Sequence, residues 1–138
     1  MVRYFIVSII CGVLFGAMDA IIHANPFAQQ MLSVYRPITK ASVNVPAGIL
    51  IDLFYGFILG FLFLLLYKSL PGRTGFAKGI SFALIVWFFR IAMNAVSSWM
   101  MFTVPAATLL YVTSAGLLEM LLLGFVYGMY LKPLGHIK

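Results

Sequence analysis

The sequence GVLFGAMDAIIH, which runs from Gly12 to His23, places an acid and an imidazole inside an apolar stretch that begins near Tyr4. Its two glycines, Asp19 and His23 follow one another at steps of three or four residues, so an α-helix would carry them on one stripe. Small and ionisable residues among apolar neighbours predict a membrane helix that turns this stripe towards other helices. The other charges inside apolar stretches are Asp52, Arg90 and Glu119.

The composition excludes a water-soluble domain. Of 138 residues, 64% are hydrophobic and only 9% are charged, and the apolar side chains gather in four long stretches. A hydrocarbon core of about 30 Å needs about 20 apolar residues per helix, so four spans use nearly the whole chain. We therefore predict an all-α polytopic membrane protein, a single integral membrane domain over residues 1–138. Its four transmembrane helices should form an up-down bundle, with spans at about 3–23, 47–67, 76–99 and 108–130.

Proline and polar residues mark the connections between the spans. Asn25-Pro26 is typical of a helix start. The segment of about 26–35 that follows is too short to cross a bilayer, so we predict a short interfacial helix between spans 1 and 2. The N-terminal stretch is expected to be retained, because Asp19 stands where a small-residue cleavage site would be. The single cysteine, Cys11, excludes an intrachain disulfide within this sequence.

The basic residues predict the orientation of the chain in the inner (plasma) membrane of a prokaryote. If the N-terminus is cytoplasmic, two basic residues that flank the spans lie on the outer side of the membrane. They are Arg36 and Lys40. Those that lie inside are Arg3, Lys68, Arg73, Lys78, Lys132 and Lys138. We therefore expect both the N- and the C-terminus in the cytoplasm. An aromatic belt at the inner interface would then comprise Tyr4, Tyr67, Tyr127 and Tyr130.

Glycines recur along the spans at steps of about four residues and predict surfaces where helices approach closely. The predicted packing glycines are Gly12, Gly16, Gly48, Gly56, Gly60, Gly116, Gly124 and Gly128. The pattern also suggests an internal repeat, because the three glycines of the second span recur 68 positions later and Gly12 recurs as Gly79, 67 positions later. A duplicated helical hairpin would relate two parallel repeats about an axis normal to the membrane.

The charged residues of the spans are expected to meet in the outer half of the bilayer. At about 1.5 Å per residue, Asp19 and His23 lie late in an outward-running helix and Asp52 lies early in an inward-running one. Arg90 should pair with one carboxylate, because an unpaired buried ion is costly. The remaining negative charge must be neutralised by protons, the imidazole, water or a bound cation. We predict a buried polar cluster of Asp19, His23, Asp52, Arg90, Asn94 and Glu119.

Two interpretations of this cluster stay open: it locks the bundle to itself or to partner subunits, or it forms a functional site. For His23, a hydrogen bond to a neighbouring acid is favoured over ligation of a metal, a haem or a chlorophyll, and we predict no metal and no cofactor. A bis-histidine haem would need a second facing imidazole, whereas His136 lies in the C-terminal tail. The sequence holds no HExxH, phosphate-loop or Ser-His-Asp pattern, so an enzyme is not expected. It also lacks the basic, aromatic groove of a nucleic-acid-binding module.

Scattered residues over most of the chain carry a resemblance to a known family. They are Met18-Asp19, His23, the Asp52-Leu-Phe-Tyr55-Gly56 stretch, Tyr67, Pro71-Gly72, Lys78-Gly79, Trp87, Glu119 and Gly124. In these residues the sequence resembles the small four-span inner-membrane proteins of bacteria that occur beside many unrelated genes and whose activity is unassigned. The resemblance implies four spans. The sequence departs from the family in the hydrophobic, charge-free link between spans 3 and 4.

Two functions of different classes are expected. The first is a small accessory or assembly subunit that packs within a larger membrane complex, because four short-looped helices enclose little volume and leave no room for a soluble domain. The alternative is a proton- or cation-coupled small transporter that uses the polar cluster as its site. Apart from the lipid bilayer, the expected partners are therefore other membrane subunits or further copies of the chain.

Overall fold

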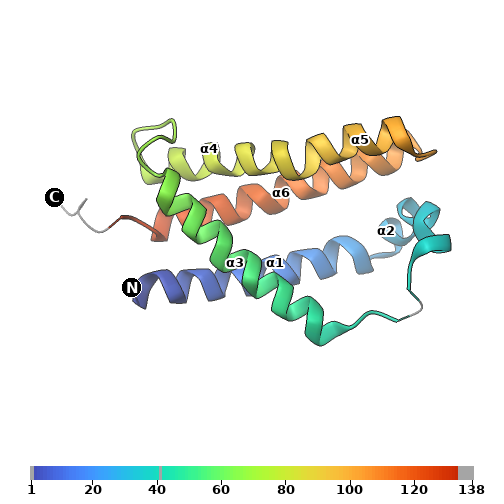
Figure 1. Ribbon diagram of the computed structural model, residues 1–138, viewed down its shortest axis with the longest axis horizontal. Coiled ribbons are helices and arrows are strands. Elements are labelled where there is room, and N and C mark those ends of the chain that lie inside the picture. The colour runs from blue at the N-terminus through green and yellow to red at the C-terminus, as the bar shows by residue number, and fades with distance from the viewer. Residues whose placement is uncertain (1, 41, 134–138) are drawn as a thin grey trace.

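A computed structural model describes residues 2–40 and 42–133, and every regular element among them is a helix. Four helices are long and apolar enough to cross a membrane, and the third is the continuous run Gly75–Met101. The predicted all-α, four-span fold is confirmed, with each span boundary within two residues of its predicted place. Along the chain (Figure 1) the elements are α1 (Val2–Ala24), α2 (Pro26–Met31), the 3-10 turn η1 (Ser33–Ile38), α3 (Val45–Leu66), α4 (Gly75–Trp87), the π-helix η2 (Phe88–Ala92), α5 (Met93–Met101) and α6 (Ala106–Tyr130).

Side-chain caps and prolines fix where three of these helices begin. The Asn25 side chain accepts a hydrogen bond from the amide of Ala28 at 2.8 Å, and Pro26 occupies the first turn of α2. Asn44 and Thr74 cap α3 and α4 in the same way. The interfacial segment predicted at 26–35 is thus two elements, α2 and η1, and it reaches residue 38.

The four spans pair as two antiparallel hairpins (Figure 1). α1 packs along α3, α4 packs along α6, and contacts between α1 and α6 join the two hairpins. The start of α1, the end of α6 and the α3–α4 turn lie at one end of the bundle, here called the termini end. α2 lies at the opposite end, the α2 end. The chain therefore runs up and down through the bundle twice.

The buried core lies near the termini end and is rich in aromatic side chains. Phe63 of α3 contacts Phe82 of α4 and Tyr127 of α6, with ring centroids 5.3 and 6.0 Å away. The hydroxyl of Tyr127 donates a hydrogen bond to the backbone oxygen of Gly56 at 2.7 Å. Tyr127 is fully buried. The prediction that Tyr127 belongs to an interfacial belt is therefore wrong, because its hydroxyl finds its partner inside the bundle.

Small residues let α1 and α3 cross almost in backbone contact. A Cβ at Gly56 would lie 2.7 Å from the Cα of Gly12. At the next glycine towards the α2 end, in contrast, a Cβ at Gly48 would meet no atom within 4 Å. The predicted packing role of Gly48 is therefore wrong in this structure, since α3 diverges from α1 at that point. The contacts that do form step by four residues along each helix and pair Ser8 with Gly60, Gly12 with Gly56, and Gly16 with Asp52.

The second hairpin stays closed further towards the α2 end. A Cβ at Gly79 or at Gly124 would collide with the backbone of the other helix, and one at Gly116 would collide with a side chain of η2. Gly79 and Gly124 stand 67 and 68 positions after Gly12 and Gly56, the contacting pair of the first hairpin. These matched contacts support the predicted internal repeat. In each hairpin the two helices cross at equivalent glycines, but only the first hairpin opens at the α2 end.

The basic side chains divide between the two ends of the bundle. Arg36 and Lys40 lie in the connection between α2 and α3, at the α2 end. Lys138, which the sequence places with the inside basic residues, lies outside the described residues. The basic residues at or beside the termini end are Arg3, Lys68, Arg73, Lys78 and Lys132. The charge asymmetry that the sequence predicts is therefore an asymmetry between the two ends of the structure.

Candidate functional site

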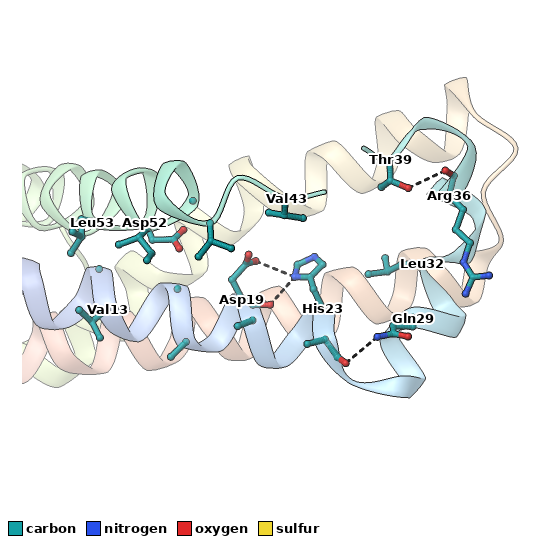
Figure 2. Close-up of a pocket in the computed structure, with 18 residues that line it drawn as sticks. Val13, Asp19, His23, Gln29, Leu32, Arg36, Thr39, Val43, Asp52 and Leu53 are labelled. Carbon is teal, nitrogen blue, oxygen red and sulfur yellow. Dashed lines mark hydrogen bonds and ion pairs between the residues drawn. The ribbon is translucent and has the colours of Figure 1, made fainter. Parts of the chain in front are cut away.

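The divergence of α3 from α1 opens a cavity of about 1050 Å³, here called the outer cavity (Figure 2). Its walls are mostly apolar residues of α1 and α3, among them Val13, Ile49 and Leu53. Residues of α2, η1 and the following loop border it at the α2 end, where Arg36 lies. A drug-sized pocket typically measures about 300–1,000 Å³, so the outer cavity is large enough for a small organic molecule.

Asp52 enters the outer cavity from α3. It packs on Gly16 of α1, because a Cβ at that glycine would lie 2.6 Å from Oδ2 of Asp52. At about 1.5 Å per residue, Asp52 stands about 10 Å below the start of α3, which is bilayer depth. Within residues 2–40 and 42–133, Asp52 makes no hydrogen bond and no ion pair. Its carboxylate is therefore available to whatever occupies the cavity.

Asp19 and His23 of α1 form an i, i+4 pair that faces the same cavity. The His23 Nδ1 lies 3.2 Å from the carboxylate of Asp19 and 2.8 Å from its backbone oxygen. In Figure 2 the carboxylates of Asp19 and Asp52 both point into the space between α1 and α3. The two side chains of the pair are each about half exposed, at 50% and 54%. The pair also borders a second, smaller space, so it lies between two compartments.

This second space is a polar chamber of about 200 Å³, bounded by α1, η2, α5 and α6. Glu119 of α6 and Arg90 of η2 line it, with Arg90 Nη1 4.0 Å from Glu119 Oε2. Glu119 is 95% buried, and its Oε1 has no hydrogen-bond partner in the described chain. One water molecule needs about 10–15 Å³ of such a volume, so the chamber has room for several. Water can therefore satisfy the free oxygen of Glu119 and link it to the Asp19–His23 pair.

Arg90 is held by aromatic rings as well as by Glu119. Its guanidinium carbon lies 4.8 Å from the ring centre of Phe15 and 4.7 Å from that of Tyr55. The two rings stack on each other, with centroids 5.3 Å apart. Cation–π contacts of this kind stabilise a charge that has lost water. Arg90 thus draws on all four spans: η2, which continues α4, together with α1, α3 and α6.

Arg90 stands at the centre of η2, where the third span changes from α- to π-helix. A π-helical turn inserts an extra residue, and such bulges are frequent at functional sites. The sequence predicted neither η2 nor a role for Phe15 and Tyr55 beside Arg90. Their spacing carried a usable signal, because Phe15 stands four residues before Asp19 and Tyr55 three residues after Asp52. Each ring therefore lies on the polar stripe of its own helix.

The structure brings the predicted cluster together as two adjoining groups. Asp19, His23 and Asp52 line the outer cavity, whereas Arg90 and Glu119 line the polar chamber. Asn94 also borders the chamber, but it is exposed and makes no hydrogen bond within the described residues. The prediction of one buried cluster is corrected on this point: among its six members only Glu119 is buried. Asp19, His23 and Asp52 are open to the outer cavity because α3 diverges, whereas Arg90 and Asn94 border the polar chamber.

The side chains that could bind a metal ion form no metal centre in the part of the chain that the structure describes. No three His, Cys, Asp or Glu side chains among residues 2–40 and 42–133 lie close enough to hold one ion. His23 has its Nδ1 engaged by Asp19. His136, which was considered as a second haem ligand, lies outside the described residues.

Replacing Arg90 with leucine should destabilise the bundle, because it leaves Glu119 buried without a counter-charge. The expected loss is about 3–5 kcal/mol. The thermal midpoint of the detergent-purified protein, followed by the monodisperse fraction after heating, measures this loss. Arg36→Leu, at the mouth of the outer cavity, is the matched control and should leave the midpoint unchanged. The double variant Arg90→Leu with Glu119→Leu should recover most of the loss, and an unchanged midpoint for Arg90→Leu alone would contradict the assigned role.

A scan against family models, a search of curated proteins and a search of solved structures each gave no match to this chain.

Proposed function

We propose that this protein is a small multi-pass carrier that couples the movement of a small solute to that of protons. The observation that carries the proposal is the outer cavity, which reaches Asp19 and Asp52 at bilayer depth. Ionisable side chains inside a membrane are expensive, and they mark substrate and proton pathways. A purely structural polar cluster would be expected to close on itself, whereas Asp52 has no partner within the described chain.

The division of the polar groups supports separate solute and proton sites. The outer cavity has apolar walls and the unpaired Asp52, which suits a solute. The polar chamber behind it holds Glu119, whose free oxygen can accept a proton. Asp19 and His23 border both spaces, so they can pass a proton from one to the other. A carrier needs this kind of contact, because coupling requires that each site responds to the occupancy of the other.

The unequal hairpins supply a movable element. α1 and α3 are in contact near the termini end and diverge beyond Asp52, whereas α4 and α6 remain in contact. Closing α3 onto α1 would continue the four-residue steps and bring Gly48 against Ala20. The outer cavity would then be shut at the α2 end. Gly48 leaves room for this approach, which explains a glycine that makes no contact in the open structure.

Cysteine cross-linking tests this movement. In a Cys11→Ser background, cysteines at Ala20 and Gly48 should form a disulfide in native membranes under mild oxidation, because a disulfide needs the two Cα atoms within about 7 Å. The matched control places the first cysteine at Ile21, which is 65% exposed on a neighbouring face of α1. It should cross-link at least about tenfold more slowly. Equal rates for the two pairs would contradict closure of α3.

We propose that the chain lies in the inner membrane of a prokaryote with its N- and its C-terminus in the cytoplasm. The basic residues at the termini end support this orientation, since positive charges favour the cytoplasmic side. The outer cavity then opens to the outside at the α2 end. In this orientation the closed, aromatic core separates the cavity from the cytoplasm.

A second candidate is the accessory or assembly subunit within a larger complex. The observation that favours it is the same divergence of α3, because a helix of another subunit could fill the open side of the first hairpin. Purification in mild detergent at native expression levels separates the two candidates. Co-migration with other subunits in a fixed ratio would favour the accessory role. A protein that elutes alone or as a homo-oligomer would favour the carrier.

Flux measurements test the carrier directly. Proteoliposomes on a solid-supported membrane should give transport currents when a pH gradient is imposed together with one class of a solute panel of organic cations, organic anions, amino acids and sugars. The current should reverse when the gradient is reversed. Because one-for-one exchange of a monovalent cation and a proton carries no net charge, uptake of labelled solute is measured as well, and absence of both a pH-dependent current and pH-driven uptake for every class would overturn the proposed function.

A further inference from the structure

We propose that the outer cavity binds a monovalent organic cation with an apolar body, and that Asp52 holds its charge. This inference rests on the proposed function only in taking the outer cavity as the solute site. It concerns binding, so it can be tested without any transport measurement.

The balance of charge in the outer cavity favours a cation. Asp19 lies 3.2 Å from His23, so a protonated imidazole meets its charge within the protein. Asp52 has no such partner among the described residues, and a bare carboxylate at bilayer depth is costly. A bound cation would remove that cost. A single unpaired carboxylate calls for one positive charge, and Arg36 at the mouth disfavours more than one.

The walls of the cavity favour an apolar body over a hydrophilic solute. Apart from the charged side chains and His23, the polar side chains that line the cavity are Gln29 and Thr39, and both are engaged locally. The Gln29 side chain donates a hydrogen bond to the backbone oxygen of Ala24 at 3.3 Å. The Thr39 hydroxyl donates one to the backbone oxygen of Arg36 at 3.0 Å. A sugar or an amino acid would lose more hydrogen bonds to water than the cavity could replace. An apolar body, in contrast, gains from contact with these walls.

An inorganic cation fits the same space poorly. Calcium takes six to eight oxygen ligands and magnesium demands an octahedral set. Asp52 offers one carboxylate, and the walls near it are Gly16, Ile49 and Leu53. No three metal-ligating side chains converge in the described ranges 2–40 and 42–133. An organic cation is weakly hydrated, so it needs a counter-charge and contact area but no complete ligand shell.

Two ions of the same shape and opposite charge provide the test. Equilibrium dialysis of the detergent-purified protein, corrected with protein-free micelles, should show saturable binding of tetraphenylphosphonium and none of tetraphenylborate. Asp52→Asn should weaken cation binding at least about tenfold. Asp52→Glu, which keeps the charge, should retain it. Both variants should elute at the position of the unsubstituted protein, which separates a lost site from a lost fold.

Three outcomes would overturn the inference. The first is equal binding of the two ions, and the second is unchanged cation affinity in a folded Asp52→Asn variant. The third is full displacement of the bound cation by phosphatidylethanolamine but not by phosphatidylcholine, which would make a lipid amine the occupant. The inference and the proposed function can fail separately. Saturable cation binding without any pH-driven current or pH-driven uptake would support the site and overturn the carrier. A current carried only by anions or neutral solutes, without cation binding, keeps the carrier and overturns the site.

Discussion

Gly124→Leu should abolish accumulation of the protein in the membrane. A Cβ at this position would collide with the backbone oxygen of Gly79, and it would lie 2.7 Å from the Cβ of Ala83. Three more side-chain carbons cannot fit between α4 and α6 without forcing them apart. The hairpin would then lose both its helix contact and the packing of Tyr127, which is fully buried one turn further along α6. Overpacking of a well-packed core costs about 1–3 kcal/mol, and backbone contacts leave less room to adjust.

The matched control is the same substitution at Gly48. A Cβ there meets no atom within 4 Å, so Gly48→Leu should accumulate like the unsubstituted protein. It should nevertheless block closure of α3 onto α1, and with it the pH-driven current. Quantitative immunoblotting of membranes and the monodisperse fraction after purification measure accumulation. Equal levels for the Gly124 and Gly48 variants would show that the two hairpins do not differ as described.

Much of the fold follows from local sequence rules. The spans follow from the length of the apolar stretches, and the starts of α2, α3 and α4 follow from Asn25, Asn44 and Thr74 with their nearby prolines or glycines. These features depend on residues within a few positions of one another. The recurrence of Gly12 and Gly56 as Gly79 and Gly124 was also readable from the sequence, and small residues are what close helix crossings require.

The shape of the site was not predictable in the same way. The pattern of glycine steps gave Gly48 the same role as Gly56, yet only Gly56 packs on another helix. Whether two helices continue in contact depends on all the side chains around them, including those of segments distant in the sequence. The aromatic clamp on Arg90 shows the same limit. The spacing of Phe15 and Tyr55 to Asp19 and Asp52 places each ring on a polar stripe, but among 13 Phe and 7 Tyr the sequence does not show that these two rings meet Arg90.

Glu119→Gln should remove the pH-driven current while leaving the protein folded. Glu119 is the buried acid of the polar chamber, with Oε1 unpartnered and Oε2 4.0 Å from Arg90. Glutamine has nearly the same shape and keeps a polar oxygen that can face Arg90, but it cannot bind and release a proton. Coupling should therefore be lost, and the current under a pH gradient should fall to that of protein-free vesicles.

Solute exchange distinguishes lost coupling from lost binding. With the same solute on both sides and no pH gradient, the Glu119→Gln carrier should still exchange solute, because Asp52 and the outer cavity are unchanged. Asp52→Asn is the comparison: it should abolish both the pH-driven current and the exchange, since it removes the charge that holds the solute. The two carboxyl-to-amide variants thus separate the two compartments. If Glu119→Gln retained a pH-driven current, the proton would bind elsewhere, and the chamber behind Asp19 and His23 would have a structural role only.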